Sequence, residues 1–352
     1  MSRVLVTGAN GHLGANVVRA LLRRGHEVVA FVRPAADLRG LAGLKLSYAY
    51  GDVFDAGALA NAAAGCEVII HSAAVFRYWV NDGTDIIQTS VIGAQNIFAA
   101  AQLAGVRRLV YTSSTYAIGS TSVFSISLNA DHWNEAACSP YAIAKVEGER
   151  EAWRLASESG IPLIVLCPAG IWGPYDYRTT PPMAWIKGLV NGTVPVIDAG
   201  GSFIDARDAA EVHALAIDQG YPGQRYILTG TDLRMTDMAR IVYRLTGSRN
   251  VRLKLGKRLM LPASGLLELW ARISGRPPLT TRSFVRDQLG QYFCADGRES
   301  NKIFGIKPRD AEAMISGAIR WLLFTGDIHK RKARQLTAHF PPDIEWIQTP
   351  AG

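Results

Sequence analysis

A glycine pattern near the start of the sequence constrains the fold most strongly. Gly8, Gly11 and Gly14 are spaced three apart, after the apolar run 4–6 and before the apolar-periodic segment 15–22. This order predicts a strand, a tight turn and a helix. Gly8 permits the turn, Gly11 lets a phosphate approach the backbone, and Gly14 lets the helix lie close to the strand. Free N–H groups at the helix start then face an anion, so the turn predicts a nucleotide-phosphate site.

Strand and helix patterns alternate through the first half of the chain, which predicts an α/β fold with a Rossmann-type, doubly wound parallel sheet. Strands are expected at 3–7, 27–32, 46–50, 67–71, 107–112 and 162–167, and helices at 12–24, 56–64, 85–104 and 140–159. After Pro168 the pattern loosens, with helices at 206–217, 236–245, 259–274 and 310–324 and a strand at 224–228. The apolar stretch 259–273 is expected to be a buried or pocket-covering helix.

These patterns divide the chain into three parts. Residues 1–170 are expected to form a nucleotide-binding Rossmann domain, to which segments at about 204–230 return. Residues 171–324 form a smaller, mainly helical substrate-binding part that closes over the carboxyl edge of the sheet, where ligands bind in such folds. Residues 325–352 are an irregular C-terminal tail.

Composition excludes several classes of protein. The chain has 352 residues, 48% of them hydrophobic, and four cysteines without CxxC or metal spacing. We therefore expect reduced thiols, no metal site and a location in the cytoplasm. The sequence contains no run of about 18 apolar residues, so we expect no membrane span. The N-terminus enters a strand at once, so we expect no signal peptide. The net charge of +8 fits either a solvated basic surface or attraction of an anionic cofactor. No aromatic-basic pattern indicates nucleic acid.

A second group of residues carries acid–base chemistry. Tyr141 and Lys145 are four apart on a predicted helix and share one face. An ammonium group beside a buried phenol favours the phenolate, which makes the tyrosine a better proton donor and acceptor near neutral pH. Ser114 follows a predicted strand, where its hydroxyl can hold a substrate oxygen. Residues 112–115 fit a plain helix cap or turn as well.

Taken together, these segments resemble the extended short-chain dehydrogenases/reductases, within the NAD-dependent epimerase/dehydratase superfamily. The resemblance covers about residues 2–323. The motifs occur in the family's order at 7–14, 51–53, 71–74, 111–115, 141–145 and 168–174.

The resemblance assigns roles to individual residues. Ser114 would bond the substrate carbonyl oxygen, Tyr141 would exchange a proton with it, and Lys145 would bind the nicotinamide ribose and favour ionisation of Tyr141. Further cofactor contacts would come from Gly8, Asn10, Gly11, His12, Leu13, Gly14, Asp52, Val53, Ser72, Ala73, Ala74, Thr112, Ser113, Pro168, Ala169, Gly170 and Ile171. Ser90 stands where the family has asparagine. This difference weakens the expectation that an asparagine supports a water molecule or a helix kink there. His12 stands where many members have an aromatic or aliphatic residue, and packing fits it better than acid–base work.

The residues after the second strand bear on cofactor choice. NAD-preferring sites place an acid there to hold the ribose hydroxyls, but this chain has Arg33, and the nearest acid is Asp37. Arg33 could pair with a 2′-phosphate through two parallel hydrogen bonds, or be an ordinary surface arginine. We expect NADP(H).

The reaction and the substrate are inferred from the resemblance to one branch of the family and from the position of aromatic residues. The chain looks most like the dihydroflavonol reductase branch, which implies reversible reduction of a ketone or aldehyde, with an apolar, aromatic or steroid-like substrate. Aromatic residues just after motif segments fit such a pocket or the core: Phe76, Tyr78, Trp79, Tyr116, Trp133, Trp172 and Tyr175. The alternatives are an NAD-dependent sugar-nucleotide epimerase or dehydratase and a non-catalytic NADP-sensing regulator. A homodimer is possible in this family.

Overall fold

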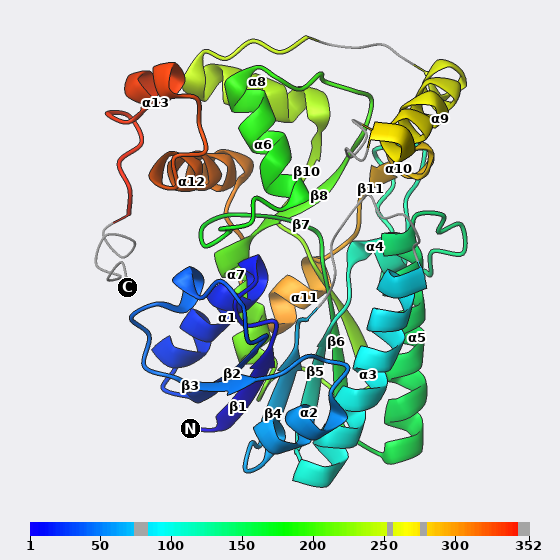
Figure 1. The fold of residues 1–352 in the computed structure, drawn as a ribbon, viewed down its shortest axis with the longest axis vertical. Coiled ribbons are helices and arrows are strands. Elements are labelled where there is room, and N and C mark those ends of the chain that lie inside the picture. Colours follow the sequence, from blue (N-terminus) through cyan, green and yellow to red (C-terminus); the bar gives the residue numbers. More distant parts are fainter. Residues whose placement is uncertain (74–83, 252–255, 275–279, 344–352) are drawn as a thin grey trace.

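The computed structural model describes residues 1–73, 84–251, 256–274 and 280–343. Seven strands form the larger sheet, in the spatial order β3 (Ser47–Tyr50), β2 (Glu27–Val32), β1 (Arg3–Thr7), β4 (Val68–His71), β5 (Arg108–Thr112), β6 (Leu163–Pro168) and β9 (Gln224–Leu228) (Figure 1). Every neighbouring pair in it is parallel. The predicted Rossmann-type sheet is therefore confirmed. The strand order reverses between β1 and β4, and ligands bind at the carboxyl ends of strands beside such a reversal.

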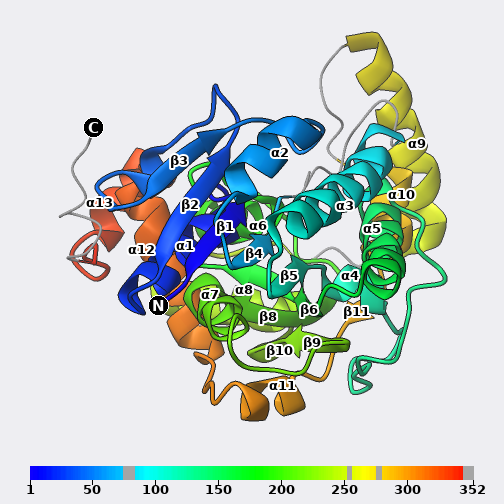
Figure 2. The ribbon, with the colours of Figure 1, turned by 90° about the horizontal axis from the view of Figure 1, so that it is seen from below.

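Strand β1 shows why the larger sheet is covered on both faces. Val4 and Val6 point into one apolar core and Leu5 into the other, because successive side chains of a strand alternate. Helices α1 (His12–Arg23) and α7 (Ala206–Leu215) pack together on the first face, and α2 (Ala56–Ala63), α3 (Thr84–Ala104) and α5 (Pro140–Ser159) cover the second (Figure 2). Burial on both faces explains the near-continuous apolar runs of these strands.

A second, smaller sheet lies beyond the carboxyl edge of the larger one (Figure 1). Its central strand β8 (Gly200–Asp205) pairs in parallel with β7 (Gly170–Trp172) and β11 (Tyr292–Phe293), and antiparallel with β10 (Thr231–Arg234). The helices of this part and its connections are α4 (Thr115–Ile118), α6 (Pro181–Asn191), α8 (Met235–Thr246), α9 (Lys257–Ser274), α10 (Arg282–Gln288), α11 (Arg298–Ile303), α12 (Ala311–Phe324) and α13 (Lys330–Leu336). A single 3₁₀ turn, η1 (Arg39–Leu41), follows β2.

The second half differs from the sequence prediction at several points. The helices expected at 236–245 and 310–324 are present as α8 and α12. The second sheet was not predicted, and helix α13 lies in the segment after 325 that we expected to be irregular.

Helix α9 contradicts a prediction, because apolar residues on one of its faces are exposed. Leu266 is 70% exposed and Ile273 is 79% exposed. The helix lies at the periphery of the molecule in both views (Figures 1 and 2). The expectation of a buried helix over 259–273 is therefore wrong for this face. Periodicity reveals an apolar face, but it does not reveal whether anything covers that face.

Candidate active site

The glycine turn joins β1 to α1 and has the geometry of an anion-binding turn. Gly8 has a φ of +67°, and a Cβ there would lie 2.8 Å from Cα of Ala73. A Cβ at Gly14 would lie 2.1 Å from the carbonyl oxygen of Gly8, so glycine is needed for α1 to approach β1 this closely. No side chain caps the start of α1 at Gly11, and the N–H groups of its first turn are therefore available to an anion.

A cavity of 660 Å³ connects this turn to the predicted catalytic residues. Ser114, Tyr141 and Lys145 all line it. It is also lined by the predicted cofactor residues Gly8, Asn10, Gly11, His12, Leu13, Gly14, Arg33, Asp52, Val53, Ser72, Ala73, Thr112, Ser113, Pro168, Ala169, Gly170 and Ile171. Ala74 lies outside the described residues. The cavity runs from the carboxyl ends of β1, β2, β4, β5 and β6 to the smaller sheet.

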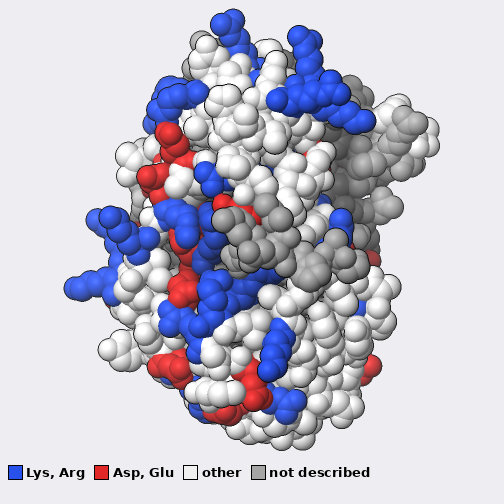
Figure 3. Space-filling model, turned by 90° about the vertical axis from the view of Figure 1, so that its left-hand side faces the viewer, with Lys and Arg blue, Asp and Glu red and all other residues white. Residues whose placement is uncertain are grey.

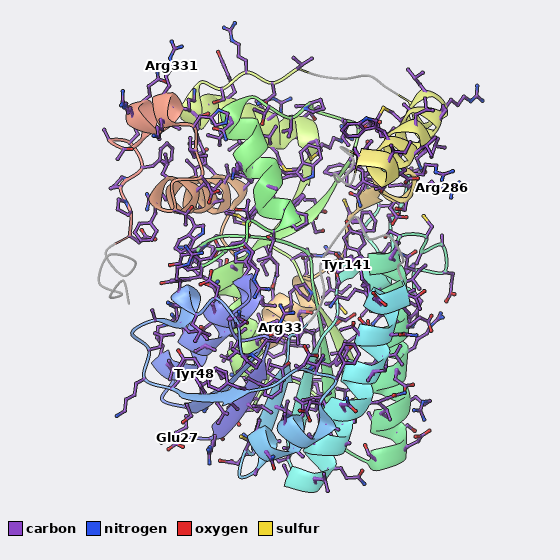
Figure 4. The ribbon with its side chains drawn as sticks, in the orientation of Figure 1. Glu27, Arg33, Tyr48, Tyr141, Arg286 and Arg331 are labelled. Atoms are coloured by element: carbon purple, nitrogen blue, oxygen red, sulfur yellow. The ribbon has the colours of Figure 1, made fainter. Side chains whose placement is uncertain are left out.

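Tyr141 and Lys145 are placed by the start of helix α5. The hydroxyl of Ser139 accepts a hydrogen bond from the N–H of Ala142, and Pro140 occupies the first turn, so the helix begins at a fixed point. Tyr141 and Lys145 then lie one turn apart, each 9% exposed. Figure 4 places Tyr141 between the larger sheet and the smaller part. The Lys145 amine lies 6.0 Å from the centre of the Tyr141 ring.

The Lys145 amine is held at the cavity wall by the backbone. Its Nζ donates a hydrogen bond to the backbone oxygen of Thr112 at 3.2 Å. Burial lowers the pKa of Lys145 from 10.5 to about 8, although the carboxylate of Glu149 opposes this shift. Burial also lowers the pKa of His71 to about 3 and that of His213 to about 4. Both imidazoles are therefore neutral at pH 7, which leaves Lys145 as the cation beside Tyr141.

Ser114 combines two roles that the sequence left as alternatives. Its oxygen caps α4 by accepting a hydrogen bond from the N–H of Tyr116 at 3.2 Å. The hydroxyl hydrogen is not used by that bond and can be donated to an acceptor in the cavity. A cap therefore fixes Ser114 without removing its donor.

A buried ion pair supports α5 behind the site. The carboxylate of Glu149, fully buried, lies 2.6 Å from Nε of Arg225 on β9. Glu149 also accepts a hydrogen bond from the hydroxyl of Ser113. Ser113 lines the cavity, but its hydroxyl hydrogen is donated to Glu149 and is therefore not available to a ligand. The pair fixes the face of α5 that carries Lys145 one turn earlier.

Arg33 follows directly after β2 and reaches the cavity wall. Its side chain is exposed, and within the described residues it forms no ion pair with a carboxylate. Asp37, the nearest acid, is bound by Arg39, whose Nη2 lies 2.7 Å from a carboxylate oxygen. This hydrogen bond holds the pKa of Asp37 below its usual value. Figure 4 shows Arg33 at the cavity's end of the larger sheet. The loop therefore presents a cation, and its acid is already paired.

Two departures from the family pattern have structural explanations. The His12 ring is almost buried, with Nδ1 3.7 Å from a carboxylate oxygen of Asp176. Asp176 also accepts hydrogen bonds from the N–H and hydroxyl of Thr180, so His12 contacts the loop that leads into α6. Ser90 lies on α3 against α5, where a Cβ at Gly148 would lie 2.9 Å from its Cβ. Small residues at both positions let the two helices pack closely.

The predicted aromatic residues are only partly brought together. Tyr116 and Trp172 line the cavity. The Tyr116 ring lies 5.2 Å from that of Tyr141, edge to face, and Trp172 stacks on Phe203 at 4.1 Å. Tyr175 lies away from the cavity under the guanidinium of Arg19, and Trp133 contacts the guanidinium of Arg225. Phe76, Tyr78 and Trp79 lie outside the described residues.

Sequence reasoning missed the cavity wall that the smaller part supplies. Two of those residues, Met235 and Met238, lie in α8, whose predicted helical pattern gave no sign of a cavity. The others come from segments for which no helix or strand was predicted: Arg178, Trp185, Phe203, Phe284, Gln288 and Phe293. His213, whose Nε2 lies 3.1 Å from the hydroxyl of Thr112, was missed too. A histidine inside a helical segment gives no local signal of its partner.

A second cavity, of 420 Å³, lies between α1 and α7. Three of its four arginines pair with acids: Arg23 with Glu211, Arg207 with Asp205, and Arg309 with Asp208. The fourth, Arg19, donates hydrogen bonds to the backbone oxygens of Ala15 and Gly40. Figure 3 shows basic and acidic side chains interspersed along this face. Mutual neutralisation makes this cavity a weaker anion site than the cavity beside Arg33.

Known proteins were compared with this arrangement. The profile of the "NAD dependent epimerase/dehydratase family" matches residues 4–228. The chain belongs to that family. It is an oxidoreductase of the extended short-chain type, which confirms the predicted resemblance.

Similar proteins cover almost the whole chain. "Sterol demethylase protein B" of Methylococcus capsulatus is 32% identical over 338 residues, covering 92% of this chain and 99% of its own. A Synechocystis protein that carries the name of a dihydroflavonol 4-reductase is 29% identical over 328 residues, covering 90% and 93%. The crystal structure of gox2253 is 31% identical, with a TM-score of 0.81, and covers 94% of this chain and 100% of that one. Within the described residues, no helix is long and apolar enough to cross a membrane.

Proposed function

We propose that this chain reversibly reduces a ketone or aldehyde carbonyl of an apolar, ring-containing compound to the alcohol, with NADP(H). One observation carries the proposal: the cavity that begins at the glycine turn and Arg33 also contains Tyr141, Lys145 and Ser114. A cofactor site and an acid–base pair in one cavity are what carbonyl reduction requires.

The residues present fit a nicotinamide dinucleotide. The cradle left by Gly8, Gly11 and Gly14 would hold its pyrophosphate against the start of α1. Asp52 and Val53 would contact the adenine, residues 168–171 would flank the nicotinamide, and Lys145 would hold the nearby ribose. When bound, the cofactor supplies the hydride.

The side chains of the protein handle the carbonyl oxygen. Ser114 donates its hydroxyl hydrogen to that oxygen and fixes its position. Tyr141 gives the oxygen a proton during reduction and takes it back during oxidation. The Lys145 ammonium stabilises the phenolate that Tyr141 becomes, and it costs little reorganisation because Thr112 already holds it.

Arg33 supports NADP(H) over NAD(H). A guanidinium can bind a 2′-phosphate through two charge-assisted hydrogen bonds. An acid would be needed to favour the 2′-hydroxyl, and Asp37 is engaged by Arg39.

The cavity lining supports an apolar substrate with rings. Trp172, Phe203, Phe284 and Phe293 contribute flat apolar surfaces, and Tyr116 adds a polar group at the edge. The name of the Methylococcus relative concerns a sterol, which is a compound of this chemical class.

A substrate panel tests this proposal. The purified protein is given NADPH or NADH with steroidal ketones, bicyclic ketones and aromatic aldehydes, and oxidation of the cofactor is followed. We expect turnover with NADPH and at least one of these carbonyl compounds. A parallel assay follows epimerisation of a UDP-sugar. Silence across the panel together with formation of the epimer would replace the reductase by a sugar-nucleotide epimerase.

The pKa of Lys145 leads to a prediction about pH. Because Lys145 loses its charge as the pH rises through about 8, kcat/KM for carbonyl reduction should fall above that pH. The variant Lys145→Arg keeps its charge at every accessible pH, so its residual activity should lack this fall. The pH profile of kcat/KM for both proteins is the measurement. The same fall in both would assign the titration to another group.

A further inference from the structure

Helix α9 carries a continuous apolar stripe on its outer face. The stripe residues recur at helical spacing, with Leu269 and Trp270 adjacent, and so lie on one side of the helix. Their side chains are between 52% and 79% exposed: Leu259, Leu266, Leu269, Trp270 and Ile273. Pro262, also exposed, lies on the same side.

The inner face of α9 carries both apolar and polar side chains, and Ala271 is buried on it. Ser264 is fully buried there, and the carboxylate of Glu268 lies 2.8 Å from Nε of Arg282 on α10. A surface helix normally turns its apolar side to the core and its polar side to water. This helix also presents a row of apolar side chains to solvent, and exposed apolar patches of this kind mark interaction surfaces.

We propose that α9 docks the protein on the surface of a bilayer that contains anionic phospholipid. From Leu259 to Ile273 the stripe is about 21 Å long at 1.5 Å per residue. An interfacial helix needs to bury such a face only about 5–10 Å into the headgroup and acyl boundary. Leucine and tryptophan are among the residues that such helices present to lipid.

The charges around the stripe favour an anionic surface. Arg258 on α9 is exposed. Arg286 on α10 is exposed as well (Figure 4). The amine of Lys257 donates a hydrogen bond to the backbone oxygen of Arg286, which joins the two helices at this end. The carboxylate of the neighbouring acid Asp287 accepts hydrogen bonds from the thiol of Cys138 and the N–H of Ser139. Among the described residues Arg258 and Arg286 form no ion pair, so their charges are available to phosphate headgroups.

A second copy of the chain fits the stripe less well. A strip about 21 Å long on a helix about 10 Å wide offers a fraction of the roughly 800 Å² that each partner contributes to a stable interface. The stripe also carries no hydrogen-bonding side chain except the Trp270 indole, so little would fix a protein partner's orientation.

The docked position would orient the cavity. Helix α10 packs on α9, and its residues Phe284 and Gln288 line the cavity wall. A protein held through α9 therefore turns this wall toward the lipid. The docking surface itself does not depend on the reaction proposed above.

Vesicle binding tests the inference without any activity assay. The purified protein is sedimented at low ionic strength with vesicles of phosphatidylcholine alone or mixed with phosphatidylglycerol. We expect stronger binding to the mixed vesicles, and a loss of that preference in Arg258→Gln/Arg286→Gln. The double variant Leu266→Gln/Ile273→Gln should lower the partition coefficient about tenfold or more, because each buried apolar side chain contributes strongly.

Controls keep the outcomes distinct. Leu103 on α3 is 78% exposed, so Leu103→Gln makes the same chemical change elsewhere and should bind like the unaltered protein. Absence of binding by the unaltered protein, or equal binding by Leu266→Gln/Ile273→Gln, would overturn the inference. Sedimentation equilibrium without vesicles tests whether a second copy of the chain binds the stripe instead. A dimer that Leu266→Gln/Ile273→Gln dissociates would make the stripe a self-association surface and would also overturn it.

Discussion

Replacing Tyr141 by phenylalanine should lower kcat for carbonyl reduction by about 10²–10⁴-fold, the usual contribution of a positioned general acid. The phenol is the one group on α5 that can give the carbonyl oxygen a proton inside the cavity, as Lys145 is held by the backbone of Thr112. Phenylalanine keeps the ring that packs edge to face against Tyr116, so the fold and the cofactor site are unchanged. Affinity for NADPH, measured by titration of protein fluorescence, should therefore stay within a few-fold of the original.

The neighbouring tyrosine provides the matched control. Tyr116 lines the same cavity, but its hydroxyl accepts a hydrogen bond from Nε2 of Gln288 at 2.7 Å. Tyr116→Phe removes an equivalent hydroxyl and should change kcat only a few-fold. The opposite pattern, a large loss in Tyr116→Phe and full activity in Tyr141→Phe, would move the proton donor to α4.

The larger sheet and its ligand edge were predictable because their determinants are local. The alternation of apolar strands and amphipathic helices covers consecutive residues, and the glycines of the first turn occupy fixed positions between β1 and α1. Tyr141 and Lys145 could be paired for the same reason: a helix brings positions four apart onto one face. Each of these inferences depends on residues that are close together in the sequence.

The second sheet was not predictable because its strands are short and depend on distant partners. β7 has three residues and β11 has two. Glycine further weakens the strand pattern of β8, yet it is required there. A Cβ at Gly200 would lie 2.5 Å from the backbone oxygen of Leu233, and one at Gly201 would lie 2.9 Å from that of Phe293. Close approach of neighbouring strands thus selects residues with a low strand propensity.

Helix α6 was not predicted, because prolines interrupt the apolar pattern after Pro168. Two of them, Pro181 and Pro182, occupy the first turn of α6. Proline is favoured there, since the first N–H groups of a helix have no partner within it. Because α6 was not predicted, the part of the cavity wall that its residue Trp185 forms was not predicted either.

Arg33→Asp is expected to reverse cofactor preference. The change removes the cation that we propose binds the 2′-phosphate and puts a carboxylate where NAD-dependent sites hold the ribose hydroxyls. Loss of a charged hydrogen bond of about 1.5–3 kcal/mol corresponds to a roughly 10–150-fold weaker Kd for NADPH. The Kd for NADH should stay the same or fall. Titration of both cofactors against the same preparation gives the ratio directly.

A second charge reversal separates local binding from long-range attraction. Lys45 is exposed in the same connection between β2 and β3 but does not line the cavity. Lys45→Asp alters the net charge as much as Arg33→Asp does, so a general electrostatic effect would weaken NADPH equally in both variants and would fade with salt. A specific contact predicts a large change for Arg33→Asp alone. Equal losses of NADPH and NADH affinity in Arg33→Asp would instead make Arg33 an ordinary surface cation. Any measured preference for NADP(H) would then have to come from another residue of the cavity wall. Arg178 would be the first to test, because it also lines the cavity.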